Sequence, residues 1–265
     1  MPRPSATFAV WSSAWLAGSA APDDVLDALA PWADAHDVQC VDDATADATR
    51  LPAPGAPVSS LTFLLAALRR LAPRGAARLV LTAPGDVRGL PGPGSFGSAV
   101  IRAGEGVFFP DAGLGLVPSQ VADGVLRWTV YPVPDPGAPA EHVPLNQAER
   151  DLREQVRQSA SILTDLGVAR HRPGVREEIA AALRSRPRSL WPAGMPQQAL
   201  RVLQHADEVE AILAAASVDE PGGALSASAA TARREALRPL ETAVRIARRA
   251  AVAEAVRVLA SAPLV

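Results

Sequence analysis

The chain has 265 residues, and all 26 of its basic residues are arginine, so no site in it can use a lysine amine. This composition excludes P-loops, protein-kinase sites and Schiff-base enzymes, which need a lysine in the chain. With 48% hydrophobic residues and a net charge of −2, the chain can bury a core, and it does not have the overall charge of a nucleic-acid-binding surface.

Cysteine content and hydropathy favour a cytoplasmic protein. Cys40 is the lone cysteine, so no disulfide can form within the chain, and we expect a reducing compartment. No apolar run reaches the roughly 18 residues that a membrane-spanning helix needs, so we expect no membrane contact. We also expect no metal and no cofactor. His36 and Cys40 are close in sequence, but no third or fourth ligand is evident.

The first part of the chain alternates between strand and helix patterns. The pattern predicts strands at residues 7–11, 38–41 and 77–81. It predicts one helix from Pro22, with Val25, Leu29 and Trp32 on its apolar face, and a second that begins after Ser59 or Ser60. This β-α-β-α-β order requires parallel strands joined by right-handed crossovers.

Antiparallel signals follow this parallel start. Residues 98–102 and 107–109 flank a glycine-containing turn at 103–106, which predicts a hairpin. Residues 125–131 alternate apolar and polar side chains, which is typical of a further strand. The sequence therefore predicts an α/β domain with a mixed sheet over residues 1–138.

The segment 130–139 carries prolines at alternate positions, which excludes helix and predicts an extended linker. After it, patterns with helical period predict an all-α bundle of about four helices over residues 139–265. Pro239 lies inside the last predicted helix, residues 226–260, and should kink or interrupt it.

The loops after the three predicted parallel strands form the first candidate ligand site, because parallel strands end at one edge of a sheet. The simpler interpretation is that these serines and aspartates cap turns and helices and that the tryptophan is part of the core. The candidate residues are Ser12, Ser13, Trp15, Asp42, Asp43, Asp86 and Arg88.

A second candidate is the glycine-rich loop with Gly92, Gly94, Ser95 and Gly97. Its glycine spacing matches a dinucleotide-binding fingerprint, but that fingerprint must open a helix, and a hairpin is predicted here. We therefore interpret it as a candidate anion-binding loop, or as an ordinary surface loop.

The third candidate is an arginine face on the last predicted helix, formed by Arg234, Arg238, Arg245 and Arg248. Such a face can contact phosphates or an acidic partner. More often it is simply solvated, which is what we expect here.

No motif identifies a reaction. We expect a non-catalytic protein that binds a protein partner or a small ligand. The alternative is a small-molecule enzyme with its site at the carboxyl edge of the parallel strands. Nucleic-acid binding through the arginine face ranks third.

Overall fold

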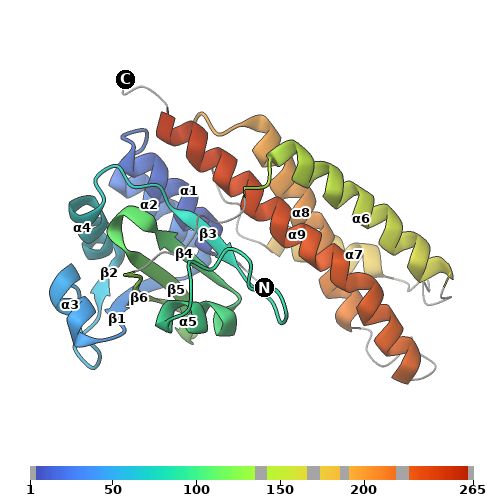
Figure 1. Ribbon diagram of the computed structural model, residues 1–265, viewed down its shortest axis with the longest axis horizontal. Helices are drawn as coiled ribbons and strands as arrows, with labels where there is room; N and C mark the ends of the chain where they lie inside the picture. Colours follow the sequence, from blue (N-terminus) through green and yellow to red (C-terminus); the bar gives the residue numbers. More distant parts are fainter. Residues whose placement is uncertain (1–3, 135–141, 166–173, 186–190, 219–226, 262–265) are drawn as a thin grey trace. The chain divides into compact units, whose positions relative to one another are not determined.

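The computed structural model describes residues 4–134, 142–165, 174–185, 191–218 and 227–261 (Figure 1). The chain divides into two compact units. The first consists of Met1–Glu141, Pro187–Pro196 and Val252–Val265, and the second of His142–Arg186 and Gln197–Ala251. An α/β region with a mixed sheet precedes an all-helical part, so the predicted fold class is confirmed.

The strands are β1 (Ala35–Cys40), β2 (Ser59–Ser60), β3 (Arg78–Leu81), β4 (Glu105–Phe109), β5 (Leu114–Ala122) and β6 (Val125–Pro132). They form one sheet in the order β2-β1-β6-β5-β4-β3. β1 is parallel to β6, and every other neighbouring pair is antiparallel. Three antiparallel steps separate β3 from β6, so β1 and β3 run in opposite directions.

The first predicted strand is wrong. Residues 7–11 belong to helix α1 (Pro4–Leu16), in which twelve of the thirteen residues are buried. An apolar segment buried on all sides shows neither the period of a strand nor that of an amphipathic helix, so periodicity cannot distinguish the two. The expected chain of parallel crossovers therefore loses its first strand.

The other helices of the α/β region are short. Helix α2 begins at Pro22 as predicted, and α4 begins directly after Ser60 and buries Leu61, Leu64, Leu65 and Leu68 at helical spacing. The predicted hairpin is wrong, because α5 takes the place of its first strand and buries Phe96, Ala99 and Val100 at helical spacing. The bounds are α2 Pro22–Leu29, α3 Asp43–Thr49, α4 Leu61–Leu71 and α5 Ser95–Ala103, with 3₁₀ turns at Ala30–Trp32 and Pro110–Ala112.

Helices α1 and α5 cover opposite faces of the sheet (Figure 1). The Phe8 ring of α1 contacts Phe109 and Trp128, with ring centroids 6.2 and 4.9 Å away. Phe96 of α5 contacts Phe108, the neighbour of Phe109 in β4, at 6.3 Å. Because successive strand residues point to opposite faces, these two contacts define two separate layers of core.

Phe96 sits over two strand positions that lack a side chain. A Cβ atom at Gly115 would overlap the Phe96 ring, and one at Gly106 would lie 3.3 Å from it. Glycine at both positions allows α5 to approach the sheet closely.

The regular secondary structure described in the second part of the chain is all α-helix, and Pro239 lies within its last helix as predicted. Of the predicted linker, residues 130–132 belong to β6 and residues 135–139 lie outside the described residues, and the boundary at 138/139 stays a prediction. None of the described helices is both long and apolar enough to cross a bilayer. The helices are α6 (Leu145–Asp165), α7 (Val175–Ser185), α8 (Gln197–Val218) and α9 (Ala227–Ser261).

Candidate functional site

The structure does not bring the residues of the predicted sheet-edge site together. Ser12 lies inside α1, Asp42 follows β1, and Asp86 follows β3. Because β1 and β3 run in opposite directions, the loops that follow them leave the sheet at opposite ends of the strands. The premise of three adjacent parallel strands was wrong.

Each acidic residue of this predicted site caps a helix, begins a helix or pairs with a neighbouring arginine. Asp42 accepts a hydrogen bond from the backbone N–H of Thr45 at 2.7 Å and caps α3, of which Asp43 is the first residue. Asp86 forms an ion pair with Arg88 at 2.8 Å. These are the turn and cap roles that the simpler interpretation assigns to such residues.

Ser13 and Trp15 of that site connect α1 to other parts of the α/β region. The Ser13 hydroxyl accepts a hydrogen bond from the Ala77 N–H at 2.9 Å and donates one to the Ala9 carbonyl at 2.7 Å. Arg69 stacks over the Trp15 ring at 4.4 Å and donates to the carbonyls of Trp15 and Leu16. Arg69 thus satisfies carbonyls at the C-terminus of α1, which lack partners within the helix.

The glycine-rich loop does open a helix after a strand, contrary to the hairpin we expected. Gly94 precedes Ser95, the first residue of α5, with φ +150°, and Gly92 has φ +144°. A Cβ at Gly97 would lie 3.0 Å from the Gly92 carbonyl oxygen. However, β4 returns antiparallel to β3, so this is not the parallel βαβ unit that binds dinucleotides. Backbone conformation and close packing therefore account for the glycine spacing.

The arginine face is not uniformly solvated. Arg234 and Arg238 are exposed, whereas Arg245 and Arg248 are buried. The Arg248 guanidinium forms ion pairs with Asp207 and with Glu210, the latter at 3.2 Å. Burial acts to lower the pKa of Arg248, but the two carboxylates outweigh it and raise that pKa above its ordinary value. The expectation of a solvated face is wrong for half of these residues.

The pair His36 and Cys40 has structural partners. Burial raises the pKa of the Cys40 thiol, against the opposing effect of its hydrogen bond with Thr49. His36 contacts Leu29 and Trp128 through its two ring nitrogens. In the described parts of the chain, no group of three or more His, Cys, Asp or Glu side chains is placed to hold a metal ion.

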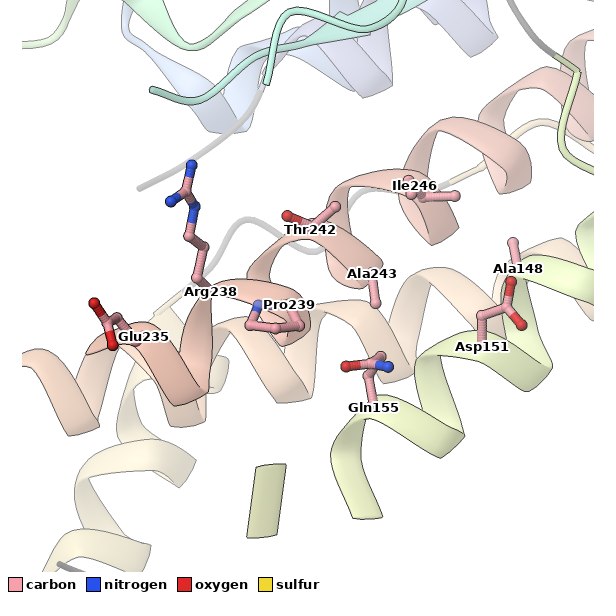
Figure 2. Close-up of a pocket in the computed structure, with 9 residues that line it drawn as sticks. All are labelled: Ala148, Asp151, Gln155, Glu235, Arg238, Pro239, Thr242, Ala243 and Ile246. Atoms are coloured by element: carbon pink, nitrogen blue, oxygen red, sulfur yellow. The ribbon is translucent and has the colours of Figure 1, made fainter. Parts of the chain in front are cut away.

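A groove of about 680 Å³ lies between α6 and α9 (Figure 2). Its apolar lining consists of Ala148, Pro239, Ala243 and Ile246, and its polar lining of Asp151, Gln155, Glu235, Arg238 and Thr242. A volume of this size suits a small molecule.

The geometry of the groove follows from how α6 meets α9. The buried Ser159 hydroxyl of α6 donates to the Ala236 carbonyl of α9 at 3.2 Å, while Ala148 and Ile246 line the other end of the groove. The two helices are therefore antiparallel. Pro239, which has no N–H to donate to the Glu235 carbonyl within α9, is one of the residues that line the groove.

Sequence reasoning missed this groove. The one signal for it was Pro239 inside a helical pattern, which indicated a kink without showing what lies beside it. Asp151 and Gln155 are four residues apart and therefore share a face of α6, but that spacing is common on solvated helices.

Both parts of the chain, the α/β region and the helical part, match models of known protein families. Residues 5–143 match the family model described as Rv1486c-like protein, N-terminal domain, and residues 146–249 match Rv1486c-like protein, C-terminal domain. The chain belongs to this family.

Similar proteins come from mycobacteria. The uncharacterized protein Rv1486c of Mycobacterium tuberculosis is 40% identical over 281 residues, covering 94% of this chain and 96% of its own. The uncharacterized protein ML1804 of Mycobacterium leprae is 33% identical with the same coverage. No solved structure matches the chain.

Proposed function

We propose that this protein is a non-catalytic binding protein that holds a small molecule in the groove between α6 and α9. The observation that carries the proposal is the groove itself, about 680 Å³ in volume, which is lined by alanine, proline and isoleucine side chains together with carboxylate, guanidinium, amide and hydroxyl groups. We place this role in the cytoplasm, where the buried Cys40 thiol remains reduced.

The two alternative functions have less support. The enzyme hypothesis depended on Ser12, Asp42 and Asp86 meeting at one sheet edge, and they lie on separate elements whose loops diverge. The nucleic-acid hypothesis depended on an open arginine face, but the charge of Arg248 is already matched by Asp207 and Glu210. Both alternatives therefore rank below ligand binding.

A thermal-shift screen of the full chain against nucleotides, amines and other metabolites tests the proposal, since a ligand of the native state raises the melting temperature. Gln155→Trp places a bulky ring at the half-buried rim of the groove. Gln158→Trp is the matched control, because Gln158 is exposed and does not line the groove. Both substitutions remove the same 3.0 Å hydrogen bond, which the Gln155 amide nitrogen donates to the Gln158 side-chain oxygen.

The expected result is a ligand that stabilises the wild type and the Gln158→Trp variant but not Gln155→Trp. If every stabilising ligand acts equally on the two variants, the groove is not the binding site.

A further inference from the structure

We draw no further inference here: the strongest candidate, the surface at the edge strand β2 where the exposed apolar side chains of Val58 and Phe63 flank the strand in sequence, carries nothing because no feature of the described residues shows what covers it.

Discussion

The indole N–H of Trp128 donates a hydrogen bond to Nδ1 of His36 at 3.2 Å. Nε2 of the same ring lies 2.9 Å from the Leu29 carbonyl oxygen, to which it donates. Nδ1 must carry a lone pair to accept from Trp128, so this arrangement requires a neutral imidazole with its hydrogen on Nε2. Burial acts in the same direction and lowers the pKa of His36, against the smaller opposing effect of the Leu29 carbonyl.

The first prediction is that the free energy of unfolding decreases as the pH falls below the ordinary histidine pKa of about 6.5. In that range the unfolded chain binds a proton at His36 that the folded chain resists, so stability is complete above this pH and is lost below it. His36→Gln removes this proton linkage. Urea unfolding at several pH values should therefore show a steeper loss for the wild type than for His36→Gln. Parallel curves for the two proteins would contradict the prediction.

The second prediction separates two neighbouring serines of α1. Ser13→Ala leaves the buried Ala77 N–H without its acceptor, which should lower the free energy of unfolding by about 1–3 kcal/mol. Ser12→Ala is the matched control. The Ser12 hydroxyl donates to the Phe8 carbonyl within its own helix, so its loss should cost less than about 1 kcal/mol. Urea denaturation of the two variants measures the difference, and equal costs would remove the structural role assigned to Ser13.

How much of the fold could be predicted depended on how each segment is buried. Helices α2 and α4 each bury one face, so their apolar residues repeat with a clear helical period. Helix α1 is buried almost completely and has no such period. The strand directions were missed for another reason: β1 and β3 are both strands with a helix between them, but β6, β5 and β4 lie between them in the sheet, so they do not form the adjacent parallel pair that the pattern predicts.

The candidate site could not be predicted for a different reason. The groove exists because α6 lies antiparallel to α9, and no pattern within either helix specifies which helix is its neighbour. The same limit applies to the arginines of α9. Helical spacing places Arg238 and Arg245 on one face, but only the packing of the folded chain leaves the first exposed and buries the second.

The third prediction contrasts two arginines that the sequence pattern treats alike. The Arg248 side chain is only 4% exposed, and Arg248→Ala removes the ion-pair partner that Asp207 and Glu210 of α8 share. Asp207 and Glu210 are 44% and 16% exposed, so water compensates part of the loss, and we expect the free energy of unfolding to fall by about 2 kcal/mol. Arg234→Ala removes an exposed arginine of the same helix and should change stability by no more than about 0.5 kcal/mol. Urea denaturation at neutral pH measures both effects.

The loss in Arg248→Ala should come from the charge of the two carboxylates. Adding Asp207→Asn and Glu210→Gln to that variant should therefore recover part of the lost stability. A triple variant no more stable than Arg248→Ala would show that Arg248 stabilises the helices through packing instead of charge.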